Sequence, residues 1–250
     1  MDMELKQQFA ERWERYFDGA DLPITFYYTD RENAAEPATV PSGHQCVIGS
    51  LARVRKGRSL RFDVDSVGCF GGKRYFGFTE TAMPKLDYFL SCGIPGEMEG
   101  ERYKKTPEIA RAAIEAMPEF SAPARYIVFK RWDMLEEADE PAVVIFFAPP
   151  DVLSGLFTLA GFDEADANAV VAPFCAGCGS IVQHPYLEKD SEHPRAVVGM
   201  FDVSARPFVP AGVLSFAVPM AKFARMVANM PDSFLITPSW QKVHKRIARE

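Results

Sequence analysis

The chain has 250 residues, of which 48% are hydrophobic and 25% are charged, so it is long enough for one large globular domain or two small ones. Its 28 Lys and Arg against 34 Asp and Glu give a net charge of −6, which argues against nucleic acid or an anionic membrane surface as the main partner. Five cysteines cannot all pair within the chain, and a domain of this size needs no disulfides. We therefore expect a soluble, cytoplasmic protein with reduced thiols.

Helical and extended patterns alternate in the first half of the chain. Residues 1–17 carry apolar side chains every three or four positions, which predicts an amphipathic helix and not a signal peptide. Residues 67–77 contain four glycines, which predicts a flexible loop. The other expected elements are, in order, a strand over 24–29, a loop over 30–41, a helix over 44–56 with Ser42 as its cap and Gly57 after its end, a strand over 59–64, and helices over 84–91 and 107–117, the last capped by Thr106.

The second half contains the most apolar strand pattern of the sequence. Residues 142–147 (AVVIFF) are apolar throughout, which predicts a central strand. No uncharged apolar run reaches the length of a membrane-spanning helix. The other expected elements are a strand over 125–130, a helix over 149–159, a strand over 168–174, a short helix over 176–183, strands over 195–200 and 214–218, and helices over 219–230 and 239–249.

Strands mixed with helices predict an α+β architecture, with a mixed sheet or sheets and flanking helices. The segment 117–123 is a candidate boundary between two lobes of similar size, residues 1–118 and 124–250. A single domain over residues 1–250 is the alternative.

Cysteines beside glycines are the pattern that points most directly to chemistry, because the common hydrolase, phosphate-loop, zinc-protease and dinucleotide motifs are absent. Without a Cβ, the backbone can turn around a sulfur and direct N–H groups at it. Four converging thiolates would form a zinc site or hold a four-iron cluster, and burial of each cysteine as a small hydrophobic residue is the alternative. The glycines concerned are Gly68, Gly71 and Gly72 around Cys69, Gly93 after Cys92, and Gly177 and Gly179 around Cys178.

Two other groups of residues suggest different chemistry. Cys175 or Cys178, at the start of a short helix and near His184 in sequence, could act as a nucleophile or as a redox dithiol. A metal-free domain that binds a small anionic metabolite is the second possibility, because basic residues precede the expected helix at Pro107. Its candidate anion-binding residues are Arg74, Arg102, Lys104 and Arg206.

Several segments together resemble the uncharacterised ArCR family, also called domain of unknown function 169. They are HQCVIG (44–49), VGCFGGKRY (67–75), FLSCGIPG (89–96) with EGERY (99–103), VIFFA (144–148) with the Pro-Asp that follows, and AGCGSIV (176–182). The resemblance extends from about residue 10 to residue 240.

The resemblance sorts the cysteines, although that family has no established activity. It places Cys46, Cys69, Cys92 and Cys178 at family cysteine positions and Cys175 where a small residue is expected. We therefore predict a four-cysteine metal centre, a [4Fe–4S] cluster rather than zinc, that serves a redox partner or binds a small molecule. The residues expected to contact this cofactor are Gly68, Gly71, Gly72, Gly93, Gly177, Gly179, Arg74 and Arg102.

Overall fold

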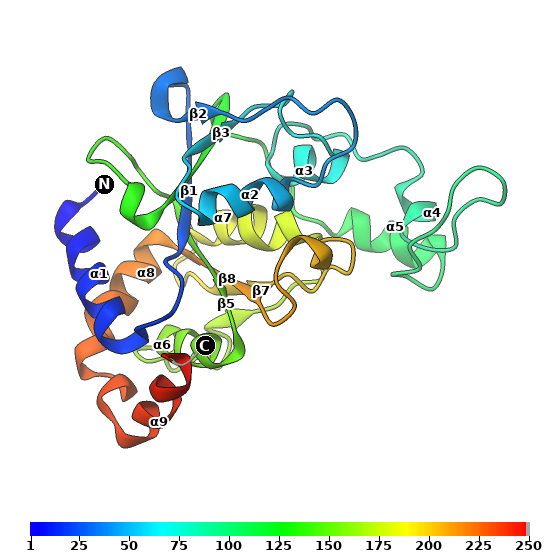
Figure 1. Cartoon of the computed structure of the whole chain (residues 1–250). Helices are drawn as coiled ribbons and strands as arrows, with labels where there is room; N and C mark the ends of the chain where they lie inside the picture. The colour runs from blue at the N-terminus through cyan, green and yellow to red at the C-terminus, as the bar shows by residue number, and fades with distance from the viewer. Residues whose placement is uncertain (249–250) are drawn as a thin grey trace.

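One mixed sheet forms the centre of the protein in the computed structural model, which describes residues 1–248 (Figure 1). In the described part of the chain its eight strands lie in the order β2-β3-β4-β1-β5-β8-β7-β6, with β2–β3 and β6–β7 parallel and the other pairs antiparallel. This confirms the predicted α+β class and the inner position of β5. The strands are β1 Ile24–Thr29, β2 Glu36–Pro37, β3 Leu60–Phe62, β4 Tyr126–Arg131, β5 Val143–Ala148, β6 Val170–Val171, β7 Ala196–Gly199 and β8 Leu214–Pro219.

The sheet draws its strands from both sides of residues 118–124. β1, from the first half of the chain, pairs with β4 on one side and with β5 on the other, and Phe26 lies opposite both Phe129 and Val143. Strands that are distant in sequence are therefore neighbours in the middle of the sheet.

The first face of the sheet packs against an aromatic core under four helices. Side chains alternate between the two faces of a strand, so Val144 and Phe146 of β5 point into this core. The ring centres of Phe9 and Phe223 are 5.0 Å apart, and the Trp240 indole N–H donates to the Tyr16 carbonyl at 3.0 Å. The helices are α1 Met3–Phe17, α6 Pro150–Ala160, α8 Met220–Asn229 and α9 Pro238–Ile247.

The opposite face of the sheet, which carries Val143 and Ile145, packs against a second group of helices. Cys178 is part of the buried core on this side, and Cys46 packs against its edge. Figure 1 shows α2 and α7 lying over this face, with α3 next to them. The helices are α2 Val47–Arg55, α3 Phe70–Tyr75, the π-helix η3 Gly179–Gln183 and α7 His184–Glu188.

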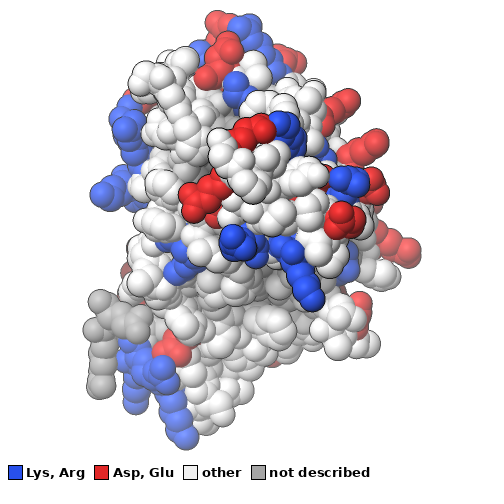
Figure 2. Space-filling model, turned by 90° about the vertical axis from the view of Figure 1, so that its right-hand side faces the viewer, with Lys and Arg blue, Asp and Glu red and all other residues white. Residues whose placement is uncertain are grey.

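Residues 84–117, which we call the arm, extend away from the sheet and its helices on the right of Figure 1. They contain α4 Leu86–Phe89 and α5 Pro107–Glu115, which pack together and are joined by the ion pair Arg111–Asp87 at 2.7 Å. Figure 2 views the molecule from this side and shows acidic and basic side chains interspersed over the surface. The mixed-charge run before Pro107 thus belongs to a surface with charges of both signs.

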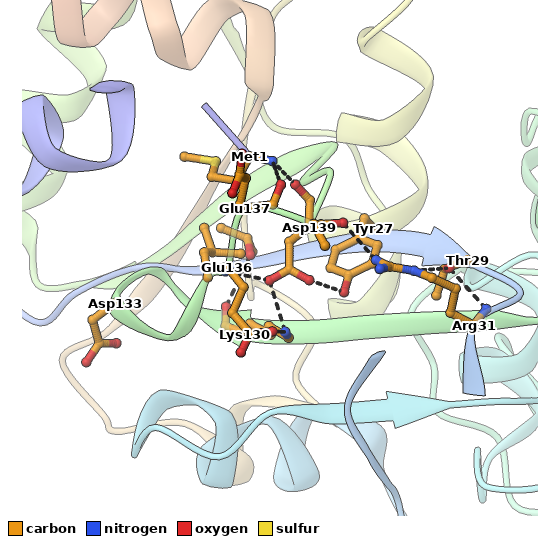
Figure 3. Close-up of polar contacts among 12 residues, drawn as sticks. Met1, Tyr27, Thr29, Arg31, Lys130, Asp133, Glu136, Glu137 and Asp139 are labelled. Atoms are coloured by element: carbon orange, nitrogen blue, oxygen red, sulfur yellow. Dashed lines mark hydrogen bonds and ion pairs between the residues drawn. The ribbon is translucent and has the colours of Figure 1, made fainter. Parts of the chain in front are cut away.

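A buried ionic network lies between β1, β4 and the segment before β5 (Figure 3). The Lys130 ammonium is 2.9 Å from the Asp139 carboxylate, and both side chains are at least 95% buried. Tyr27 donates its hydroxyl hydrogen bond to Asp139, and the Glu136 N–H donates to the same carboxylate at 2.8 Å. Because these bonds satisfy a charge that burial would otherwise destabilise, the network fixes the loop 133–139 against the sheet.

One predicted helix starts later than expected, and one predicted loop contains a helix. The helix expected from His44 under a Ser42 cap begins at Val47, with Cys46 as its N-cap residue. Residues 67–77, expected to be a flexible loop, contain α3, which begins after Cys69. Glycine lowers helix propensity, but Gly72 and Tyr75 are buried here, so tertiary packing outweighs local preference.

Other predicted elements are shorter or differ in type. The strand expected over 168–174 is only Val170–Val171, and the short helix expected over 176–183 is the π-helix Gly179–Gln183, continued by α7. Residue 249, the last of the predicted C-terminal helix, lies outside the described residues. None of the helices within residues 1–248 has both the length and the apolar character required to cross a membrane.

Candidate metal centre at the helix starts

Cys46 lies at the start of α2, on the edge of the second core. Burial raises the pKa of its thiol, and the neighbouring Cys69 raises this pKa further. The backbone N–H groups of Ile48 and Gly49 act in the opposite direction, because they stabilise a charged sulfur. Burial therefore disfavours the free thiolate of Cys46, whereas the N–H donors would stabilise that thiolate once it is bound to a cation.

Cys69 is the N-cap residue of α3, and its sulfur accepts a hydrogen bond from the Gly72 N–H at 3.2 Å. A Cβ on Gly72 would lie 2.8 Å from this sulfur and 2.7 Å from Val67, closer than side-chain atoms pack. Gly68 is similarly confined, because its Cβ would lie 2.6 Å from Pro41. The backbone thus folds closely around Cys69, as the glycines predicted, whereas a Cβ on Gly71 would have no neighbour closer than 3.9 Å.

Cys178, immediately before the π-helix η3, is the most buried of the cysteines, with 6% of its surface exposed. Burial raises the pKa of its thiol well above the ordinary value, and the charges of Cys69 and Cys46 add to this effect. The segments of these cysteines also pack on one another, since a Cβ on Gly179 would lie 2.9 Å from the Tyr75 ring of α3. Cys46, Cys69 and Cys178 thus come from three separate segments to the same side of the sheet.

Cys175 lies near Cys178, although the family resemblance predicts a small residue and not a cysteine ligand at this position. Burial, with the charge of Asp202, raises the pKa of its thiol to about 12. Burial, followed by the charges of Cys178 and Cys175, also raises the pKa of Tyr75. The Tyr75 ring packs so closely against Gly179 that a Cβ there would lie 2.9 Å from it. Tyr75 thus covers one side of the thiols.

Asp202 is a neighbour of the thiols that the sequence analysis missed. One of its carboxylate oxygens accepts the Gly177 N–H at 3.0 Å, next to Cys178. Gly177 also packs closely on the loop that follows Asp202, since a Cβ on Gly177 would lie 2.8 Å from Ala205. The spacing Asp-x-Ser at residues 202–204 is typical of a side chain that caps its own turn, but it carries no sign of the distant partner.

Cys92, the fourth predicted ligand, is exposed on the arm. Its sulfur lies 3.4 Å from the carbonyl oxygen of Gly93, the next residue of the arm. Its glycine neighbour Gly93 has a φ of 73°, and a Cβ there would lie 2.4 Å from the Met98 carbonyl oxygen, so this glycine shapes the arm itself. Within residues 1–248, no three His, Cys, Asp or Glu side chains are grouped so that they could hold a single metal ion.

The predicted anion-binding residues make contacts of their own. The Arg206 guanidinium donates to the carbonyls of Val213, Pro210 and Ala211, so it holds its own loop together. Arg74 donates to the Glu80 carbonyl at 3.2 Å. Arg102 adopts a positive φ of 57°, and its N–H bonds to the Ser91 carbonyl. Lys104 places its ammonium 3.8 Å from the centre of the Phe174 ring.

His184 is not hydrogen-bonded to a thiol: among residues 1–248, the bonds made by cysteine sulfurs go to backbone groups. Burial lowers the pKa of His184, and the charge of Glu188 partly offsets this. The raised pKa values of Cys175 and Cys178 are the opposite of what a thiolate nucleophile needs at neutral pH.

The fold and these thiols first define a class: an α+β protein with cysteines at the starts of the helices that cover one face of its mixed sheet. Residues 17–229 match the family model described as uncharacterised ArCR, domain of unknown function 169. Because the match covers more than half of the chain, the protein belongs to this family. No curated protein and no solved structure matches the chain.

Proposed function

We propose that this protein holds an iron–sulfur cluster through Cys46, Cys69 and Cys178, with Cys92 of the arm as the fourth ligand, and that the cluster serves electron transfer or the binding of a small molecule. The observation that carries the proposal is that Cys46, Cys69 and Cys178 come from separate segments to the same side of the sheet, where the backbone folds closely around the Cys69 sulfur. Bound iron would supply the redox chemistry.

The electrostatics of the three thiols favour a metal. Neighbouring thiols cannot all ionise in a buried place without a cation, since each thiolate raises the pKa of the next. Iron displaces the thiol protons and offsets the resulting negative charge. The N–H groups that face Cys46 and Cys69 would then stabilise the sulfurs and help to set the cluster potential.

The backbone around the thiols is the reason for proposing a cluster rather than zinc. The Gly72 N–H donates to the Cys69 sulfur at 3.2 Å, and the N–H groups of Ile48 and Gly49 face Cys46. Such N–H donors stabilise the negative charge of a cluster and its thiolate ligands.

One side chain of the arm reaches a residue near the thiols, which supports Cys92 as the fourth ligand. The Lys104 ammonium lies 3.8 Å from the centre of the ring of Phe174, which precedes Cys175. Within the arm, the Lys104 N–H donates to the carbonyl of Leu90, two residues before Cys92, at 2.9 Å. Binding of Cys92 to the cluster would require the arm segment around it to move.

The first experiment is anaerobic purification and reconstitution with iron and sulfide, followed by iron and sulfide analysis and visible absorption. We expect about four irons per chain, and loss of most of the iron in Cys46→Ser, Cys69→Ser and Cys178→Ser. Cys175→Ser is the matched control, because this thiol lies beside the others and is expected to keep the cluster. A wild-type protein that takes up neither iron nor sulfide overturns the proposal.

The role of Cys92 needs a separate measurement. If it binds the fourth iron, Cys92→Ser should give a cluster with three irons, or with an altered fourth site, in Mössbauer and EPR spectra. An unchanged four-iron spectrum in Cys92→Ser, together with loss of iron in Cys175→Ser, would assign the fourth position to Cys175 instead.

A further inference from the structure

The chain segments that precede α2 and α3 are hydrogen-bonded to each other. The Gln45 N–H donates to the Gly68 carbonyl at 3.3 Å. A Cβ on Gly68 would lie 3.1 Å from the Gln45 nitrogen, so this glycine allows the two main chains to come close. Cys46 and Cys69 follow directly on this contact and are the N-cap residues of the two helices. One main-chain contact therefore fixes both cysteines relative to each other.

A second contact lies on the other side of the two cysteines. A Cβ on Gly72 would lie 2.8 Å from the Cys69 sulfur. The same Cβ would lie 3.5 Å from a methyl group of Val47, the residue after Cys46. Segments joined by a main-chain hydrogen bond run about 5 Å apart, and a disulfide spans about 4.4–6.8 Å between Cα atoms. A disulfide between these cysteines therefore needs little movement of the main chain.

The surroundings of the two sulfurs suit oxidation. Cys46 and Cys69 are both partly exposed, so an oxidant from solution can reach them. The Gly72 N–H, which donates to the Cys69 sulfur at 3.2 Å, stabilises negative charge on that sulfur. The Cys175 sulfur instead faces the Pro173 carbonyl at 3.6 Å, a contact that favours the neutral thiol. Cys69 is thus better prepared than Cys175 to attack an oxidant.

We infer that Cys46 and Cys69 are a modification site, at which a peroxide closes a reversible disulfide between the starts of α2 and α3. The inference concerns the metal-free chain and does not rest on the proposed function. A closed disulfide would withhold both sulfurs from a metal.

The reaction has two steps. The Cys69 sulfur attacks one oxygen of hydrogen peroxide, the O–O bond breaks, and the other oxygen leaves as water with the thiol proton. The Cys46 sulfur then attacks the sulfenic acid on Cys69, so that the S–S bond forms and the S–O bond breaks. A second water leaves with the Cys46 proton. Two electrons pass from the two thiols to the peroxide.

The test is oxidation of the full chain, freed of metal with a chelator, by one equivalent of hydrogen peroxide. The remaining thiols are blocked with N-ethylmaleimide, and the unreduced tryptic peptides are analysed by mass spectrometry. We expect peptide 32–53, which contains Cys46, linked to peptide 62–73, which contains Cys69. The number of free thiols, measured in denaturant, should fall by about two, and dithiothreitol should restore them.

Three variants sharpen the result. Cys46→Ser should stop at the sulfenic acid, which dimedone traps on Cys69. Cys69→Ser should lose the linkage. Cys175→Ser is the matched control, because this cysteine is also partly exposed, and it should form the disulfide as the wild type does. The peptide map of the wild type decides the inference even where a variant does not fold.

Two results would overturn the inference: a main linkage between Cys175 and Cys178, or no loss of thiols on oxidation. The two proposals also fail separately. A chain that takes up iron and sulfide but links other cysteines overturns the disulfide alone. A chain that closes this disulfide but takes up no iron overturns the proposed function alone.

Discussion

The Gly72 N–H donates a hydrogen bond to the Cys69 sulfur across 3.2 Å, and the missing Cβ of this glycine leaves the sulfur its space. Added there, a Cβ would lie 2.8 Å from the sulfur. The adjacent Gly71 is different, since its Cβ would meet only Tyr75, at 3.9 Å. Two neighbouring glycines on one helix thus have unequal tolerance for a methyl group.

This difference gives a matched pair of variants. Gly72→Ala should lower the free energy of unfolding by about 1–3 kcal/mol, because the methyl group overpacks the core. It should also lower the iron bound per chain. Gly71→Ala should raise the free energy of unfolding by about 0.5–1 kcal/mol, because alanine favours the helix. Urea unfolding and iron analysis check both, and equal behaviour of the two variants would contradict the role given to Gly72.

The thiols should differ in reactivity in the metal-free protein. Cys92 is exposed, whereas Cys178 is buried with a raised pKa. We expect iodoacetamide at pH 8 to label Cys92 first and Cys178 last, because the thiolate is the reactive form and must be reached by the reagent. Peptide mass spectrometry after short exposures measures the order. Equal labelling rates for the two in folded protein would contradict the burial of Cys178.

Breaking the buried pair Lys130–Asp139 should strongly lower the free energy of unfolding, whereas replacing both residues by apolar ones should lower it little. Asp139→Ala leaves a buried ammonium without its main partner and should lower the free energy of unfolding by about 3–5 kcal/mol. The double variant Lys130→Met/Asp139→Leu should recover most of this loss, because no buried charge remains.

The surface pair Arg58–Glu36 is the control for this prediction. Both of its side chains are more than half exposed. Glu36→Ala should therefore change the free energy of unfolding by less than about 1 kcal/mol. Urea unfolding curves measure all the variants, and a small effect of Asp139→Ala would show that the network is not an important source of stability.

The same network predicts how stability depends on pH. Burial alone would raise the pKa of Asp139, but hydrogen bonds from Tyr27, the Glu136 N–H and Lys130 outweigh it and lower this pKa. A lowered folded-state pKa gives stability that is present above the unfolded-state pKa and lost as the pH falls through the folded-state value.

The stability difference between wild type and Asp139→Asn should therefore be constant above about pH 5 and shrink in more acidic solution. Urea midpoints at a series of pH values test this. A difference that grows as the pH falls would contradict the lowered pKa.

The strands were predictable from local sequence because their patterns are strong. Residues 24–29 are β-branched and aromatic and form β1 with the expected bounds, and the apolar run 142–147 forms the inner strand β5. In both cases burial on two faces demands the same residues that the backbone prefers.

α3 was not predictable in this way. Its glycines disfavour a helix locally, and the stabilising contacts come from elsewhere: Tyr75 packs on Gly179, about a hundred residues away in sequence. The position of the Asp202 carboxylate near Cys178 likewise depends on a contact between two loops, the Gly177 N–H bond to Asp202. The sequence of either loop alone does not predict this contact.

The amino-acid sequence by itself determined the family, the α+β class, most of the strands and the set of cysteines worth testing, because these follow from local patterns and spacing. Only the tertiary structure decided that Cys46, Cys69 and Cys178 come to the same side of the sheet, that Asp202 binds the Gly177 N–H next to Cys178, and that Cys92 lies exposed on the arm. Proximity between distant segments arises when helices pack onto a common face of the sheet, and the sequence carries no local record of that packing.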